Sequence, residues 1–391
     1  MPSRPPSETP AVPPRTADVK NAYASYALSF VFSALVALLV PIVPLLALRM
    51  GASQFEIGII GSAGPLCYVP LALLSGVLAD KFRRKGLLVM SSCLYAVTCA
   101  IYSTASAPLH LIAGRLMDGI SAAMLWPAVE ALLADSANVS GDKMVSNFGV
   151  LWSSGSLVGG LASSVVLWFG DYEIVFIPCA VVSLLMGLLS VILISEGNRP
   201  QNKPRGEAQD NSSTPKRMTS TWSMAALYSF CQGTIFSLYP AYAQLKGVPG
   251  AMIGLTITLL LAGRTITFYL YRFVKQNFRS LALAGALMAS LFSLMLIFST
   301  EPFLLLPCGL LLGVGVGLCY SAAIRSALEA DPSSRGTYAG LFEGSIGLGY
   351  LLGAGIGGLA AEFVLEGPYV MSSVVALSAS ALLAKDWGGT E

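Results

Sequence analysis

The chain has 391 residues, of which 55% are hydrophobic and only 11% are charged, and its formal net charge is +2. A soluble domain carries about 25% charged residues and cannot bury this much apolar surface, so the composition requires a lipid environment. The seven cysteines and the single histidine show no metal-ligand spacing, so we expect no metal and no cofactor.

The chain then divides into a tail, two groups of apolar segments and a linker. Residues 1–20 hold six prolines and no apolar run, which predicts a disordered cytoplasmic tail. A span needs about 20 apolar residues, and twelve such segments follow, at 22–47, 55–79, 86–106, 109–134, 145–169, 173–195, 222–245, 251–274, 280–299, 303–329, 337–364 and 369–385. The polar stretch 196–221 is a linker that separates the first six segments from the last six. We therefore predict an all-α membrane protein with six-helix bundles at 21–195 and 222–391.

Positive charges are distributed unevenly over the two sides of the membrane. Of the 23 Lys and Arg residues, three lie in the interior of predicted spans (Arg115, Arg264 and Arg325) and two, Arg49 and Lys246, lie in loops on one side. The remaining 18 lie on the other side, together with both termini and the linker. Because cytoplasmic loops carry the excess of Lys and Arg, we expect a multi-pass protein of the inner or plasma membrane with both termini in the cytoplasm.

The two groups of six spans are similar in sequence. A shift of 196 positions (315 − 119) maps Gly119 onto Gly315, and it maps other residues from the first to the end of the fourth span. Beyond the fourth span the shift changes to 192 (347 − 155), where Gly155 matches Gly347. This repeat predicts two six-helix halves related by an axis along the membrane normal.

The loop between the second and third spans is the first motif with a recognisable pattern. It reads GVLADKFRRK from Gly76 to Lys85, and it resembles the signature loop of the major facilitator superfamily (MFS). The matching residues are Gly76, Asp80, Lys81, Arg84 and Lys85. Arg83 stands where that family has a second glycine. Either the acid and its neighbouring cations form a latch that pairs with the other half in one state, or the cations only enforce topology.

The fourth span carries a second motif. Arg115, four residues before Gly119, is similar to the pattern of proton-coupled MFS members. Arg115 and Asp118 are three residues apart and therefore share a helix face. An ionisable group in mid-membrane costs at least ~2.5 kcal/mol, so Asp118 faces a cavity or a partner. Either it is a protonation or substrate site tuned by Arg115, or the two form a structural pair that neutralises itself.

The fifth span carries Gly155, Gly159 and Gly160. This spacing resembles the antiporter signature of the drug- and metabolite-exporting MFS members, with Ser156 where those proteins have proline. The resemblance implies an antiporter. The alternative is that the glycines only allow close helix packing.

Further polar residues lie inside spans. An arginine in mid-membrane marks a functional site by default, so Arg264 contacts an anionic substrate group or else pairs with an acid such as Glu343. The family resemblance places the first, fourth, seventh and tenth spans around a central cavity, which puts Gln232 and Tyr320 on the substrate pathway. Tyr239 is predicted to join them because Pro240 loosens the helix beside it, and the alternative for such an aromatic residue is an interfacial anchor.

An inner gate is predicted from charges near the cytoplasmic ends of spans four and ten. The 196-residue shift brings Arg325 to within one position of Glu130 (325 − 196 = 129). A bridge between Glu130 and Arg325 would close the cytoplasmic side. The competing pair is Arg325 with Glu329, four residues on along the same helix.

Together these features predict a secondary transporter that moves a small organic solute by alternating access, as a proton-coupled exporter. A proton symporter or a uniporter for uptake is the alternative within this class. A sensor or a lipid-handling protein on the same fold is the alternative outside it, and the lack of clustered catalytic residues argues against an enzyme. The expected partners are the bilayer, a solute and protons, without nucleic acid, and we expect a monomer.

Overall fold

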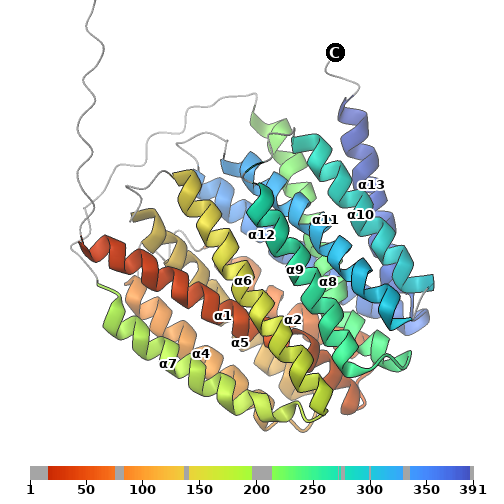
Figure 1. Cartoon of the computed structure of the whole chain (residues 1–391), viewed down its shortest axis with the longest axis horizontal. Coiled ribbons are helices and arrows are strands. Elements are labelled where there is room, and N and C mark those ends of the chain that lie inside the picture. Colours follow the sequence, from red (N-terminus) through yellow and green to blue (C-terminus); the bar gives the residue numbers. More distant parts are fainter. Residues whose placement is uncertain are drawn as a thin grey trace, which may run out of the picture.

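The computed structural model of the chain is almost entirely helical (Figure 1). It describes residues 16–74, 83–135, 141–195, 214–271, 273, 278–298, 301–328 and 335–387, with the backbone alone at some helix ends. Within these ranges lie twelve long helices and one short 3-10 helix. The prediction of twelve transmembrane helices is therefore confirmed. Most of the predicted tail and linker lies outside these ranges.

The first half contains six long helices and the 3-10 helix η1 (Glu173–Val175). The long helices are α1 (Thr16–Arg49), α2 (Gln54–Leu73), α4 (Arg84–Ser103), α5 (Pro108–Asp135), α6 (Gly141–Phe169) and α7 (Phe176–Leu193). Among them α1 packs on α6, α2 on α5, and α4 on both α5 and α7. In Figure 1 the red to yellow-green ribbons of this half occupy one side of the molecule.

The second half repeats this arrangement. Its helices are α8 (Thr214–Leu245), α9 (Gly250–Tyr271), α10 (Phe278–Phe298), α11 (Pro302–Leu328), α12 (Arg335–Phe363) and α13 (Gly367–Trp387). Here α8 packs on α12, α9 on α11, and α10 on both α11 and α13. Each contact corresponds to one in the first half, and the halves meet where α2 packs on α12 and α6 on α9. We call the face where α1 begins the terminal face, and the opposite one the distal face.

Ten of the described helices are long and apolar enough to cross a membrane. Of the other two, α8 is less apolar, and the side chains of α13 are described only as far as Ala381. The reason for α8 lies in its packing. From Met224 to Ala243 nearly every residue of α8 is buried by other helices, including Ser229, Gln232 and Thr234. A helix shielded from lipid in this way can carry polar residues that a lipid-facing helix cannot.

The same turn follows the first helix of each half. Gly51 and Gly247, which are 196 positions apart (247 − 51), both have φ of 81°. The next residue in each turn, Ala52 or Val248, donates its N–H to the carbonyl five residues earlier, at 3.0 and 2.9 Å. Glycine adopts this left-handed conformation without the strain that a Cβ brings. The 196-residue repeat is therefore present in the backbone at these turns.

Helix packing changes the alignment of the fifth and eleventh spans. A Cβ at Gly155 would meet the carbonyl of Phe30, and a Cβ at Gly349 would meet the carbonyl of Ala226. The two carbonyls are 196 positions apart (226 − 30), whereas the two glycines are 194 apart (349 − 155). The structural counterpart of Gly155 is thus Gly349, and the alignment with Gly347 is wrong.

The fourth and tenth spans show the same 194-residue shift. Gly119 packs against the backbone of Gly64 on α2, and Gly313 packs against the backbone of Leu260 on α9. The counterpart of Gly119 is therefore Gly313, whereas Gly315 faces α10. The sequence alignment paired Gly119 with Gly315 because both are glycines. Gly313 and Gly315 both permit close helix packing, but on different sides of α11. The register changes before the fourth span and not after it.

Close contacts join the two halves near the distal face. A Cβ at Gly58 on α2 would lie 2.7 Å from the Cα of Gly358 on α12. At the symmetry-related place, a Cβ at Gly254 on α9 would lie 2.7 Å from the Cα of Ser164 on α6. In addition, the carboxylate of Glu362 accepts a hydrogen bond from the backbone N–H of Phe55 at 3.1 Å. The distal ends of the halves therefore pack backbone against backbone.

Lys246 and Glu366 form an ion pair on the distal face, outside the spanning segments. The Lys246 Nζ donates to Glu366 Oε1 at 2.7 Å and joins the end of α8 to the start of α13. This hydrogen bond lowers the pKa of Glu366 below its ordinary value and raises the pKa of Lys246 above its own. The pair stabilises the distal end of the second half at neutral pH.

Candidate functional site: a cavity between the two halves

A cavity of about 320 Å³ lies between the halves. Its wall is formed by residues of α1, α2, α5 and α6 from the first half and of α8, α9, α11 and α12 from the second. This volume is at the lower end of the range of small-molecule pockets. The charged side chains on its wall are Arg115, Asp118, Glu130, Arg264 and Glu343. All five lie within membrane-spanning helices, where ionisable groups are costly and tend to be functional.

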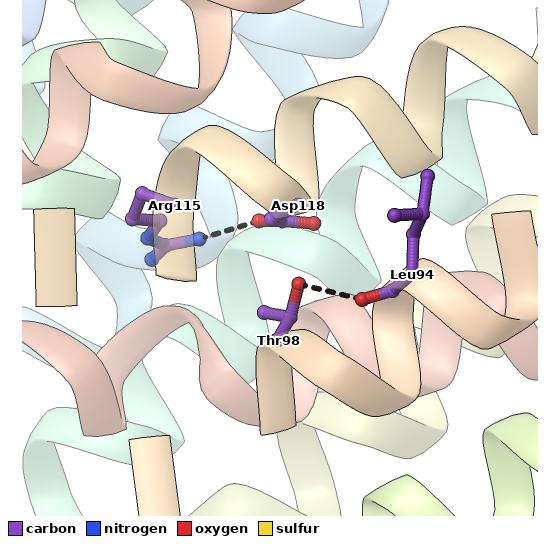
Figure 2. A network of polar contacts seen from close by, with 4 residues as sticks. All are labelled: Leu94, Thr98, Arg115 and Asp118. Carbon is purple, nitrogen blue, oxygen red and sulfur yellow. Dashed lines mark hydrogen bonds and ion pairs between the residues drawn. The ribbon is translucent and has the colours of Figure 1, made fainter. Parts of the chain in front are cut away.

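Arg115 and Asp118 form an ion pair on the cavity wall. Arg115 Nη1 donates to Asp118 Oδ2 at 3.1 Å, and both side chains are largely buried, at 13% and 14% exposure. Figure 2 shows both on one face of α5, while Thr98 of α4 donates to the Leu94 carbonyl of its own helix. The spacing predicted that the two residues share a face, and the structure brings them together.

The side chain of Arg264 contacts the opposite half of the molecule. It belongs to α9, it is 4% exposed, and its Nε donates to Ser153 Oγ on α6 at 3.4 Å. Its guanidinium carbon lies 4.6 Å from the ring centroid of Trp152, also on α6, which is a cation–π contact. Among the described residues Arg264 forms no ion pair, so a pair with Glu343 is not present in this structure.

Glu343 also contacts the opposite half. Its Oε2 accepts a hydrogen bond from the Tyr68 hydroxyl of α2 at 2.9 Å. Glu130 of α5, whose side chain is exposed to the cavity, lies close enough to Glu343 to interact with it electrostatically. Two carboxylates from opposite halves thus lie near one tyrosine, without a cationic partner among the described side chains.

Three aromatic rings from each half form matching clusters. In the first half, the Phe32 and Trp126 centroids are 5.8 Å apart and the Trp126 and Phe148 centroids are 6.1 Å apart. In the second half, Tyr320 lies 5.7 Å from Tyr228 and 5.6 Å from Phe342. Edge-to-face and tilted pairs at these distances are favourable. We call these the first and second ring clusters.

The repeat relates the two ring clusters to each other. Phe32 corresponds to Tyr228 at a shift of 196 (228 − 32), and Trp126 corresponds to Tyr320 at 194 (320 − 126). Trp152 joins the clusters, since its ring lies 6.2 Å from both Trp126 and Tyr320. Sequence reasoning predicted Tyr320 but missed the clusters. The signal that could have found them was the recurrence of aromatic residues at 194 positions.

The other predicted pathway residues lie in different places. Gln232 lines the cavity, and its Nε2 is buried without a hydrogen-bond partner among the described residues. Tyr320 lines the cavity as well. Tyr239 is 1% exposed and lies in the packed core of α8, away from the cavity wall. Its position beside Pro240 therefore does not bring it into the pathway in this state.

Part of the predicted gate and signature loop lies outside the described residues. This applies to Gly76, Asp80, Lys81 and Glu329 and to the side chain of Arg325. Of the loop cations that are described, Arg84 donates from Nη1 to the Ala131 carbonyl at 3.1 Å. This contact fixes the start of α4 against the end of α5. Lys85 is half-buried on the first turn of α4.

Two related six-helix halves around a charged central cavity define a membrane transporter that binds a small-molecule substrate, a class without enzymatic activity. Residues 25–327 match the family described as the Major Facilitator Superfamily. The chain belongs to this family. Its membership confirms the resemblance that the signature loop indicated.

Individual relatives are distant but extend over nearly the whole chain. An uncharacterised MFS-type transporter of Methanocaldococcus jannaschii is 21% identical, covering 92% of this chain and 96% of its own. The quinolone resistance protein NorA of Staphylococcus aureus is 20% identical, covering 88% and 90%. Multidrug resistance protein 2 of Bacillus subtilis is 21% identical, covering 87% and 88%.

Solved structures share the fold. The nucleoside transporter NupG superposes with a TM-score of 0.70 at 16% identity, covering 93% of this chain and 98% of its own. A bacterial homologue of the human lysosomal transporter Spinster, in an inward-facing and unoccupied conformation, gives a TM-score of 0.65 at 12% identity, with 95% of each chain covered. At these identities the likeness concerns the fold alone.

Proposed function

We propose that the chain exports a small amphipathic organic solute from the cytoplasm in exchange for protons, as a monomer in the plasma membrane. The observation that carries the proposal is the cavity, which combines aromatic rings with carboxylates inside the membrane. Aromatic walls bind apolar solutes of varied shape. Intramembrane carboxylates are the usual carriers of protons in pumps and transporters.

The terminal face is the cytoplasmic face in this proposal, as the distribution of Lys and Arg indicates. The close packing of Gly58 and Gly358 then closes the extracellular side. Two relatives are named for quinolone resistance and multidrug resistance, and these names favour export over uptake. Substrate loading from the cytoplasm is then the step that we expect in this state.

Asp118 is the proposed proton carrier, and Arg115 is the residue that tunes it. The ion pair of 3.1 Å must break or be neutralised when Asp118 takes up a proton. A carboxylate that changes charge on the wall of a substrate cavity can couple proton release to solute binding. The competing interpretation is that the pair only fills the wall with a neutral unit.

Transport in proteoliposomes tests the proposal. A quinolone and an aromatic dye would be followed with and without a pH gradient, for the wild type, for Asp118→Asn, and for Glu173→Gln, an exposed acid away from the cavity. We expect Asp118→Asn to lose gradient-driven accumulation and to keep solute exchange, and Glu173→Gln to behave as the wild type. Transport that ignores the gradient in the wild type would rule out proton coupling. Gradient-driven transport by Asp118→Asn would remove Asp118 from this role.

The inner gate remains part of the proposal. Glu130 lies on the cavity wall, and a bridge to Arg325 would form when the terminal face closes. Exchanging the two charges tests this, because Glu130→Arg and Arg325→Glu alone would each abolish transport. If the double exchange restores no transport of an aromatic solute that lacks an amine, the bridge does not exist. We likewise propose that Asp80 and the neighbouring loop cations form a latch that pairs with the other half in one state.

A further inference from the structure

Arg264 is a buried cation that needs an anion. It is 4% exposed, it lies on the cavity wall, and its described contacts are the neutral groups Ser153, Trp152 and Tyr228. An unpaired charge away from water is costly. A guanidinium also offers five N–H donors in a planar fork that matches a carboxylate, and one of these, on Nε, is used by Ser153. The donors that Ser153 and Tyr228 do not use are available to an anionic group in the cavity.

The acids on the same wall need a cation. Glu343 accepts from the neutral Tyr68 hydroxyl, and Glu130 lies within electrostatic reach of it. Two neighbouring carboxylates repel each other unless a proton or a cation lies between them. An ammonium group near Glu343 and Glu130 would relieve this repulsion.

The second ring cluster adjoins both kinds of charge on the cavity wall. Tyr320 lies 6.2 Å from Trp152, which contacts Arg264, and 5.6 Å from Phe342, which precedes Glu343 in the chain, so the second ring cluster borders both the cation and the acids on this wall. Trp152 lies under the guanidinium of Arg264 and contacts Tyr320. A flat ring system placed here would stack on these side chains while its two ends reach opposite charges.

We propose that the cavity binds a flat aromatic solute that carries an anionic group at one end and a cationic amine at the other. The anionic group binds Arg264, the rings stack between the first and second ring clusters, and the amine binds at Glu343 and Glu130. This proposal rests on the cavity being the transport site. It adds the charge class of the cargo, which the family and the fold leave open.

The test is equilibrium binding by calorimetry to the full chain in lipid nanodiscs. The probes are an aryl-piperazine carboxylic acid, its ethyl ester and its N-acetyl derivative, which share one ring system but are zwitterionic, cationic and anionic. We expect the wild type to bind the zwitterion most tightly. Arg264→Gln should weaken the zwitterion and the N-acetyl acid by about ten-fold or more and leave the ester unchanged. Glu343→Gln should weaken the zwitterion and the ester and leave the N-acetyl acid unchanged.

Matched controls keep the test decisive. Arg49→Gln and Glu173→Gln make the same chemical changes at distal positions and should alter none of the three affinities. A variant that fails to fold would lose all three probes, whereas the proposal requires selective loss. Equal binding of the probes to the wild type, or equal loss of all three in folded Arg264→Gln, would overturn it. Because binding needs no gradient, a failure of proton-driven export leaves this result standing, and the reverse also holds.

Discussion

The contact between Gly58 and Gly358 gives the sharpest prediction about how the distal face is held closed. A Cβ at Gly58 would lie 2.6 Å from the carbonyl oxygen of Ala354 and 2.7 Å from the Cα of Gly358, both of them backbone atoms. Ordinary contact begins at 3.4 Å, so Gly58→Ala must separate α2 and α12 by about 0.8 Å at this point (3.4 − 2.6). Overpacking of this kind costs about 1–3 kcal/mol.

That cost applies only while the distal face is closed. The substitution should therefore shift the population toward a state open on the distal face by about 5- to 150-fold. Spin labels at Phe55 and Phe363, which are both exposed near this contact, would report the change as a longer distance in pulsed electron paramagnetic resonance. The partly or fully exposed Cys67 and Cys93 would first be replaced by serine.

Gly86→Ala is the matched control for this prediction. A Cβ at Gly86 has no atom within 4 Å, so the same substitution there should leave the distances unchanged. If Gly58→Ala gives the same distance distribution as Gly86→Ala, the glycine contact does not hold the distal face closed, and the reasoning fails.

Three further changes test the contacts within and between the halves by thermal unfolding in detergent. Tyr68→Phe removes the hydrogen bond to Glu343 and should cost about 0.5–1.5 kcal/mol, and an unchanged midpoint would mean that water replaces it. Gly349→Ala drives a methyl group into the backbone of α8. It should reduce the free energy of unfolding by about 1–3 kcal/mol and so lower the midpoint further, whereas an unchanged midpoint would contradict the packing. Glu366→Gln removes the pair with Lys246. Because the pKa of Glu366 is lowered, its stabilisation is present at neutral pH and disappears as the pH falls through that lowered value, so wild type and variant should converge in acid.

The sequence predicted the fold well because the signals for it are local. Each span is an apolar run of sufficient length, and the turns at Gly51 and Gly247 need glycine for the same backbone reason. The pair Arg115–Asp118 was predictable for the same cause, since a spacing of three residues places two side chains on one helix face. These features depend on neighbours along the chain.

The rest depends on how helices pack, which local patterns do not specify. Gly313 and Gly315 are equally plausible partners for Gly119 in sequence, and only their contacts distinguish them. Likewise, whether Arg264 pairs with Glu343 depends on the positions of α9 and α12 within the bundle. Tyr239 was predicted to lie on the pathway because Pro240 follows it, but its side chain is buried in the core.

The repeat has a consequence for how cargo can be oriented. Arg264 occupies the position that corresponds to Tyr68 in the other half (264 − 196 = 68), and each contacts the opposite half, at Trp152 and at Glu343. Had both positions kept the same residue after duplication, they would not distinguish the two ends of a solute. With a cation at one and a tyrosine bound to an acid at the other, the two orientations differ in energy. The cavity of the duplicated fold therefore favours one orientation of a solute over the other.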